Sequence, residues 1–144
     1  MRVVDVTLPW EGGQFSGRLA RPVRPSGPAL LLAHGAGTDQ EGLAPLRDGL
    51  AGKGLSVLTF NYPYADAGRR RPDREPVLLA CHRAALEWLR REVDPHPVLS
   101  GRSMGGRMGT LLAADGAMPG PGAVRLPAPS GREAGSSAGR APLP

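Results

Sequence analysis

The sequence predicts an α/β protein with a mostly parallel sheet that carries helices on both faces. Uninterrupted apolar runs at residues 29–34 and 55–60 are typical of strands buried on both faces. Segments with helical spacing of apolar residues follow these runs, and such alternation is the pattern of a parallel sheet. All six aromatic residues fall within residues 1–116, so we expect the folded core to lie there.

The chain begins with two predicted antiparallel strands. Residues 3–8 alternate between apolar and polar side chains, and a glycine-containing turn separates them from a second strand at residues 15–21. A proline-rich loop at residues 22–28 follows, because three prolines in seven residues fit no regular element. The buried strand at residues 29–34 comes next.

The middle of the chain predicts one helix, one strand and one long loop. Leucines recur at helical spacing over residues 43–50, and glycines at positions 52 and 54 mark the end of that helix. The strand at residues 55–60 leads into a polar segment, residues 61–76, which contains three prolines. We therefore predict a loop there, without regular structure.

The last predicted elements are a helix, a short strand and a second helix. Residues 77–91 carry apolar side chains along one helical face, with arginine and glutamate elsewhere. A strand is predicted at residues 98–100 and a helix at residues 104–114. The order is therefore two strands, then strand–helix–strand–helix–strand–helix.

Composition divides the chain at about residue 116. Residues 117–144 contain no aromatic residue, and 17 of these 28 residues are Ala, Gly or Pro. Such a segment buries too little apolar surface to offset its ordering entropy, so we predict a disordered tail after a folded part at residues 1–116. On this interpretation no strand follows the helix at residues 104–114. An uncovered sheet edge would then make the protein poorly soluble.

Charge and cysteine content favour no specialised partner. The net charge is +5 and the pI about 10.6, but the only dense basic run, residues 69–71, has no interleaved aromatics. We therefore expect no nucleic-acid partner. The single cysteine, Cys81, lies in a predicted helix and is interpreted as a buried reduced thiol. No membrane span, signal peptide, metal site or cofactor is predicted, and a cytoplasmic location is expected.

The segment Gly101-Arg102-Ser103-Met104-Gly105 matches the pattern G-x-S-x-G. In isolation this pattern could be a glycine–serine loop without chemistry. Here it lies between a predicted strand and a predicted helix, where such a serine sits on a strained turn as a nucleophile. The flanking glycines would let strand and helix approach closely. The Met104 amide, at the start of the helix, would bind an oxyanion.

A second motif, His34-Gly35-Ala36-Gly37, follows the buried strand at residues 29–34. Loops at the carboxyl ends of parallel strands face the ligand site, so this loop can direct a backbone amide toward the same oxyanion. We assign that role to Ala36. His34 is interpreted as a residue that shapes the loop, not as a catalytic base.

These motifs resemble those of the small dienelactone-hydrolase-related α/β-hydrolases of the KANL/Tex type. The resemblance covers residues 1–116 and includes HGAG, the FNYPY segment at residues 60–64, the RRPD loop and GRSMGGRM. It implies the α/β-hydrolase fold and a serine hydrolase acting on a small-molecule ester or related acyl bond through an acyl-enzyme. It implies Ser103 as nucleophile, oxyanion amides from Ala36 and Met104, and Arg102 and Arg107 flanking the serine. It does not define a substrate or an oligomeric state.

The partners of the serine are missing from the pattern. Such triads run Ser, Asp, His along the chain, yet no histidine follows Ser103 in these 144 residues. His82 and His96 are interpreted as surface residues, so we expect this form to be nearly inert. A change of reading frame between about Ala114 and Arg125 would explain both this and the composition break. The alternatives are a natural tail and a non-catalytic binding or scaffold protein with the same fold.

Overall fold

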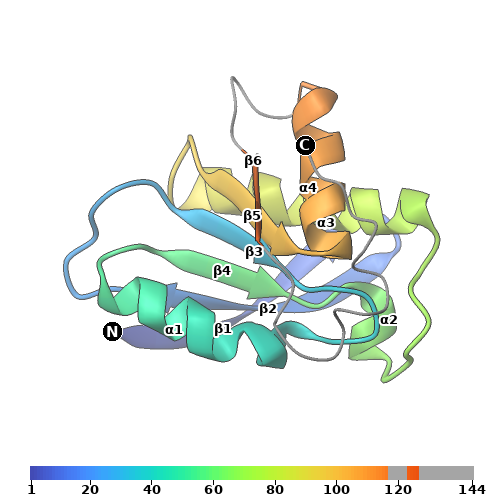
Figure 1. Cartoon of the computed structure of the whole chain (residues 1–144), viewed down its shortest axis with the longest axis horizontal. Coiled ribbons are helices and arrows are strands. Elements are labelled where there is room, and N and C mark those ends of the chain that lie inside the picture. Colours follow the sequence, from blue (N-terminus) through green and yellow to red (C-terminus); the bar gives the residue numbers. More distant parts are fainter. Residues whose placement is uncertain (117–122, 127–144) are drawn as a thin grey trace.

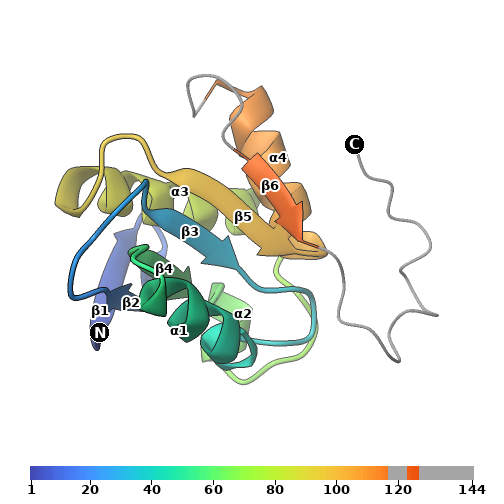
Figure 2. The same cartoon turned by 60° about the vertical axis from the view of Figure 1, so that its left-hand side comes forward.

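The computed structural model describes residues 1–116 and 123–126, which form a six-stranded sheet with helices on both faces (Figures 1 and 2). The predicted fold class is confirmed. In chain order the elements are β1 (Arg2–Trp10), β2 (Gly13–Arg21), β3 (Leu30–Ala33), the 3-10 helix η1 (Gln40–Leu43), α1 (Ala44–Gly52), β4 (Val57–Phe60), α2 (Pro63–Asp66), α3 (Glu75–Glu92), β5 (Val98–Arg102), α4 (Met104–Ala114) and β6 (Ala123–Leu126).

The strands lie in the order β1-β2-β4-β3-β5-β6. β1 pairs antiparallel with β2, and β2 pairs antiparallel with β4. The remaining pairs, β4 with β3, β3 with β5 and β5 with β6, are parallel. Four of the strands thus form a parallel sheet that an antiparallel hairpin extends at one edge.

Helices cover the two faces of this sheet unequally (Figures 1 and 2). The larger core lies beneath α3 and α4 and includes the aromatic residues that follow β4. A smaller core beneath α1 contains Leu32, Leu43 and Val57. Side chains of β3 and β4 contribute to both cores, which explains why those strands are uninterrupted apolar runs in the sequence.

The segment between β4 and α3 differs from the sequence prediction. The segment predicted as an irregular loop, residues 61–76, contains the one-turn helix α2, which begins at Pro63. Proline is favoured in the first turn of a helix because its missing N–H has no intrahelical acceptor there. Helix α3 also begins two residues before the predicted start, at Glu75, with Pro76 in its first turn.

The largest difference is β6. Residues 123–126 pair in parallel with β5 after α4, in a segment for which the composition predicted no regular element. The expectation that no strand follows α4 is therefore wrong. The expectation of poor solubility stays a prediction, because β6 is itself the end strand of the sheet among the described residues. A four-residue strand needs little apolar sequence when its backbone hydrogen-bonds to an existing edge, so average composition misses it. The rest of the predicted tail lies outside the described residues.

The topology brings two loops together. The chain runs from β3 to β4 on one side of β3, and then returns to β5 on the other side. Ala33, at the end of β3, pairs with Gly101 of β5. Because parallel strands end at the same sheet edge, the loop after β3 and the turn after β5 are neighbours at a topological switch point, where ligands bind in open α/β sheets.

Candidate active site

Ser103 occupies a strained turn between β5 and α4. Its φ of 50° and ψ of −116° make it the only residue other than glycine with a positive φ among the described residues. Such a conformation costs on the order of 1–3 kcal/mol and persists only where the surroundings impose it. Ser103 is also exposed, so its hydroxyl is accessible to a ligand.

Two glycines make that turn sterically possible. A Cβ on Gly101 would lie 2.7 Å from the backbone carbon of Gly105, and a Cβ on Gly105 would lie 2.5 Å from the carbonyl oxygen of Ala33. Atoms at these distances would clash with backbone, which cannot move aside as a side chain can. The predicted close approach of β5 and α4 is therefore confirmed, and it includes β3 as well.

The loop from His34 to Asp39, called the 34–39 loop below, contacts this turn. A Cβ on Gly35 would lie 3.4 Å from the Cβ of Ser103 and 3.5 Å from the carbonyl oxygen of Arg102. Gly37 has a φ of 74°, the left-handed conformation that glycine adopts without steric cost. The two motifs identified in the sequence therefore meet in space.

His34 is buried and has both ring nitrogens engaged. Its Nε2 accepts a hydrogen bond from the Tyr62 amide at 3.3 Å, so the proton lies on Nδ1, which donates to the Gly35 carbonyl at 2.8 Å. Burial lowers the pKa of this imidazole, which keeps it neutral. The interpretation of His34 as a loop-shaping residue is confirmed, because neither nitrogen is free to act as a base.

The Gly35 carbonyl determines where the next amide points. Besides the His34 ring, the Thr38 hydroxyl donates to this oxygen at 2.9 Å. In a trans peptide the C=O and N–H bonds point in opposite directions. Holding the Gly35 oxygen toward His34 and Thr38 therefore turns the Ala36 N–H away from them. Among the described residues, the Ala36 N–H has no hydrogen-bond acceptor.

Helix α4 supplies a second set of amides beside Ser103. Met104 is its first residue, and the amides of a first helical turn lack intrahelical acceptors. The first bond within this turn runs from the Arg107 amide to the Ser103 carbonyl at 3.0 Å. The Arg107 side chain is exposed and pairs with Glu75 of α3 at 3.4 Å. The side chain of Arg102, just before Ser103, is partly buried.

The prediction that His82 lies at the surface is wrong. His82 is fully buried on α3, its Nδ1 lies 2.9 Å from the Tyr62 hydroxyl, and burial lowers its pKa to about 3. The sequence contained a signal for this, since His82 is four residues from both Leu78 and Leu86 on the apolar face. His96 is exposed, as predicted. It precedes β5 at the amino ends of the parallel strands, whereas Ser103 follows β5 at their carboxyl ends.

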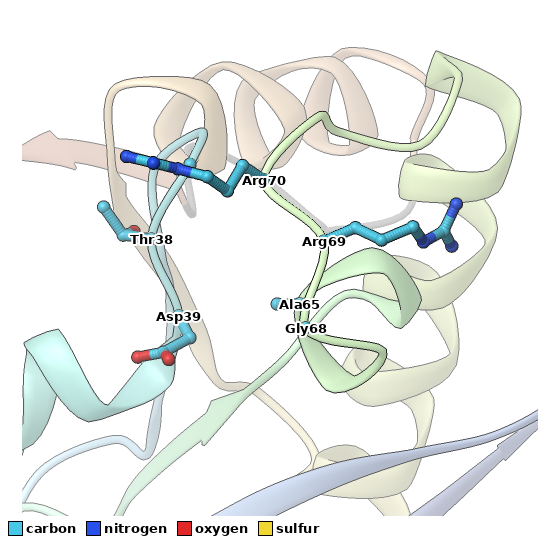
Figure 3. A pocket seen from close by; sticks show the side chains of 7 residues that line it. Thr38, Asp39, Ala65, Gly68, Arg69 and Arg70 are labelled. Carbon is cyan, nitrogen blue, oxygen red and sulfur yellow. The ribbon is translucent and has the colours of Figure 1, made fainter.

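A shallow pocket of about 240 Å³ borders the 34–39 loop (Figure 3). Residues 37–39 line one side, and the segment around Ala65 and residues 68–70 lines the other. Figure 3 shows the Arg70 side chain extending across the pocket toward Thr38, whereas the Arg69 side chain points away. Arg69 forms an ion pair with Asp73 at 3.7 Å. The pocket therefore borders Gly37, the residue that follows Ala36, and the Arg70 side chain brings a positive charge to it.

Residues 1–116 and 123–126 contain no group of three His, Cys, Asp or Glu side chains that could hold a metal ion. In the same part of the chain, no helix is long and apolar enough to cross a membrane.

The fold and the strained serine turn define an α/β hydrolase. A family model described as an alpha/beta hydrolase domain matches residues 26–133, about three quarters of the chain, and the chain belongs to this family. Two uncharacterized proteins of Mycobacterium tuberculosis, from strains H37Rv and CDC 1551, are 41% identical over 91 residues. That match covers 61% of this chain and 32% of theirs, so the chain spans about a third of these relatives.

Solved structures agree with this assignment. The esterase of Pyrobaculum calidifontis has a TM-score of 0.67 and 26% identity over 82% of this chain and 42% of its own. An α/β serine hydrolase homologue from Coxiella burnetii has a TM-score of 0.65 and 19% identity, covering 78% of this chain and 57% of its own. The metagenomic carboxylesterase EstE1 has a TM-score of 0.65 and 24% identity over 80% and 42%, respectively. The last two structures are 19% and 24% identical to this chain, so their similarity shows only a shared fold.

Sequence reasoning included the two tyrosines that follow β4 in the FNYPY segment but gave them no role. Tyr62 and Tyr64 are fully buried and contact the 34–39 loop through the Tyr62 amide and the Tyr64 hydroxyl. A signal was present, because β4 lies next to β3, and the segments that follow two adjacent parallel strands are neighbours. Treating residues 61–76 as a loop without structure hid that relation.

Proposed function

We propose that this protein is a serine hydrolase that acts on an ester or related acyl bond of a small molecule, with Ser103 as nucleophile. The conformation of Ser103, with its φ of 50° between two glycines that contact backbone, is the observation that carries the proposal. A strained, exposed serine between a strand and a helix is the arrangement that presents its Oγ to a carbonyl. The similarity to the esterase of Pyrobaculum calidifontis, at 26% identity, supports ester substrates.

The chemistry would be acyl transfer. The Ser103 Oγ attacks the carbonyl carbon, and the amides of Ala36 and Met104 donate hydrogen bonds to the oxygen that becomes negative. The leaving alkoxide takes up the proton that the Ser103 hydroxyl gives up and departs as the alcohol, while the acyl group remains on Ser103. Water later releases this group as the acid and restores the serine hydroxyl. The pocket beside the 34–39 loop offers space for one side of the ester.

The general base of the reaction is not one of the three histidines in this chain. His34 and His82 are buried with neutral rings, and His96 lies at the opposite sheet edge. We therefore propose that the 144-residue form acylates slowly and releases the acyl group more slowly still, since an activated water is lacking.

Acylation by p-nitrophenyl acetate tests this proposal. Mass spectrometry of the intact protein is expected to show one added acetyl group, which peptide mapping places on Ser103. The Ser103→Ala variant should react at least about tenfold more slowly. Ser26→Ala is the matched control, because Ser26 is exposed in the loop before β3 at the other sheet edge, and it should react like the parent protein.

The outcomes separate the two candidate functions. Equal labelling of the parent protein and Ser103→Ala would contradict the hydrolase and favour a non-catalytic binding or scaffold protein, the alternative suggested by the unsuitable positions of the three histidines. Sustained turnover that depends on Ser103 would support the hydrolase and contradict the slow deacylation proposed for this form.

A further inference from the structure

Tyr64 is the one side chain from outside the 34–39 loop that bonds to backbone on both sides of Ala36, among the described residues. The Gly37 amide donates to the Tyr64 hydroxyl at 3.3 Å, and that hydroxyl donates to the Gly35 carbonyl at 3.5 Å. Both bonds are longer than average, so each is individually weak. Together they span the peptide groups that precede and follow Ala36.

The position of the Tyr64 ring is itself fixed. The backbone amide of Tyr64 donates to the Asp73 carboxylate at 2.9 Å. The Tyr64 ring stacks on the Tyr62 ring with their centroids 6.4 Å apart, and it packs edge-on against the His34 ring with a centroid distance of 6.0 Å. The ring is fully buried although it comes from the short helix α2. Its hydroxyl is therefore a rigid contact for the loop, because the ring cannot leave without opening this packing.

The hydrogen bonds to Tyr64 determine which amide of the loop is available to bind an oxyanion. The Gly37 N–H is used by the Tyr64 hydroxyl, so it cannot also bind an oxyanion. The Gly35 oxygen is held on the inner side by His34, Thr38 and Tyr64, so the Ala36 N–H faces the other way. Of these two consecutive amides, only that of Ala36 remains available.

We propose that Tyr64 is a positioning residue of the oxyanion-binding loop: its hydroxyl engages the Gly37 amide and the Gly35 carbonyl, and thereby presents the Ala36 amide to the reacting carbonyl oxygen. This inference rests on the proposed serine hydrolase function. Preorganised donors stabilise a developing charge because they need no reorganisation during the reaction. Loosening the loop should therefore reduce the rate of acylation and leave ester binding nearly unchanged.

The test compares Tyr64→Phe with Tyr62→Phe in the full 144-residue chain. Each variant loses one buried hydroxyl, but the Tyr62 hydroxyl bonds to His82 and not to the loop. Two readouts are measured: the rate of Ser103 acetylation over a range of p-nitrophenyl acetate concentrations, and amide hydrogen exchange by NMR. A third variant, Asp73→Asn, weakens the anchor of Tyr64 without touching its ring.

Tyr64→Phe is expected to slow acylation at saturating ester about threefold to tenfold, which corresponds to the loss of one or two weak hydrogen bonds. The half-saturating concentration should stay within about twofold. Exchange of the Gly37 amide should become faster by a similar factor, while Tyr62→Phe leaves both readouts near the parent values. Asp73→Asn should show the same changes as Tyr64→Phe, but smaller.

Each contrary result has a distinct meaning. Unchanged exchange at Gly37, or faster exchange with unchanged acylation, would overturn the role of Tyr64 and leave the hydrolase intact. Equal slowing by Tyr62→Phe would overturn it too, since the effect would then come from general loss of packing. Absence of Ser103 labelling in the parent protein would instead overturn the proposed function, and the role of Tyr64 with it.

Discussion

At the scale of single residues, close backbone contacts around Ser103 determine which substitutions the neighbouring positions tolerate. Gly105 lies against the carbonyl groups of Ala33 and His34, where a Cβ would be 2.5 and 2.6 Å from their oxygens. Gly49, inside α1, has no atom within 4 Å of the corresponding position. The two helical glycines therefore differ in the space around them, although the sequence presents both simply as glycine in a helix.

We predict opposite effects for alanine at these two positions. Gly105→Ala should lower the free energy of unfolding by about 1–3 kcal/mol or more, because β3 and α4 must separate to admit the methyl group. Gly49→Ala should raise it by about 0.5–1 kcal/mol, since alanine loses less conformational entropy in a helix. Urea unfolding followed by circular dichroism measures both. Equal stability of the two variants would contradict the tight packing at Gly105.

At the scale of elements, α3 holds a polar side chain inside the larger core. His82 is fully buried, and its ring packs against Phe60 at 5.2 Å while its Nδ1 contacts the Tyr62 hydroxyl. Its other nitrogen, Nε2, has no hydrogen-bond partner among the described residues. A charged imidazole would be strongly disfavoured there, because neither solvent nor an acidic side chain offsets its desolvation.

This burial predicts acid-sensitive packing of α3. The pKa of His82 is lowered from the ordinary value of 6.5 to about 3. Between these two pH values, His82 binds a proton in the unfolded chain but stays neutral in the folded protein. The contribution of the neutral His82 ring to the free energy of unfolding is therefore fully present above pH 6.5. It is lost progressively as the pH falls from 6.5 toward 3. From pH 7 to pH 5 we expect a loss of about 2 kcal/mol from this residue.

Urea midpoints at pH 7 and pH 5 check this prediction. Replacing His82 by glutamine should remove most of the loss, although His34, whose pKa burial also lowers, contributes in the same direction. His96→Gln is the control, because His96 is exposed and should leave the pH dependence unchanged. The same pH dependence in all three proteins would exclude His82 as its source.

At the scale of the whole molecule, the single cysteine reports on cooperative unfolding. Cys81 is fully buried between α3 and the sheet, and burial raises its pKa to about 12. This confirms the interpretation of a buried reduced thiol. Because α3 covers the larger core, the thiol becomes accessible only when that core opens.

We predict that a thiol reagent at pH 7 labels Cys81 at least about a hundredfold more slowly in the native protein than in urea. The labelling rate at intermediate urea should follow the unfolding transition seen by circular dichroism. Rapid labelling without denaturant would contradict the packing of α3 on the sheet. No other cysteine interferes, since the chain contains one.

The sequence alone determined the elements of the fold and the identity of the two central motifs. The spacing of apolar side chains in a strand or helix involves residues that are close in sequence. The apolar runs of β3 and β4 and the spacing in α3 can therefore be recognised from the sequence. The glycines around Ser103 are similarly local, because a strand-to-helix turn needs small residues at fixed offsets. The elements that the sequence did not predict are β6, α2 and the 3-10 helix η1, each four residues long.

The tertiary structure decided which polar groups are engaged and which are free. Whether His34 is a base or a support depends on Tyr62, and the freedom of the Ala36 amide depends on Tyr64, almost thirty residues along the chain. Both tyrosines meet the 34–39 loop because β4 lies beside β3, a relation that sequence patterns of one strand do not contain. Whether a polar group is paired depends on contacts between elements, so only the tertiary structure shows that the Ala36 amide has no acceptor among the described residues.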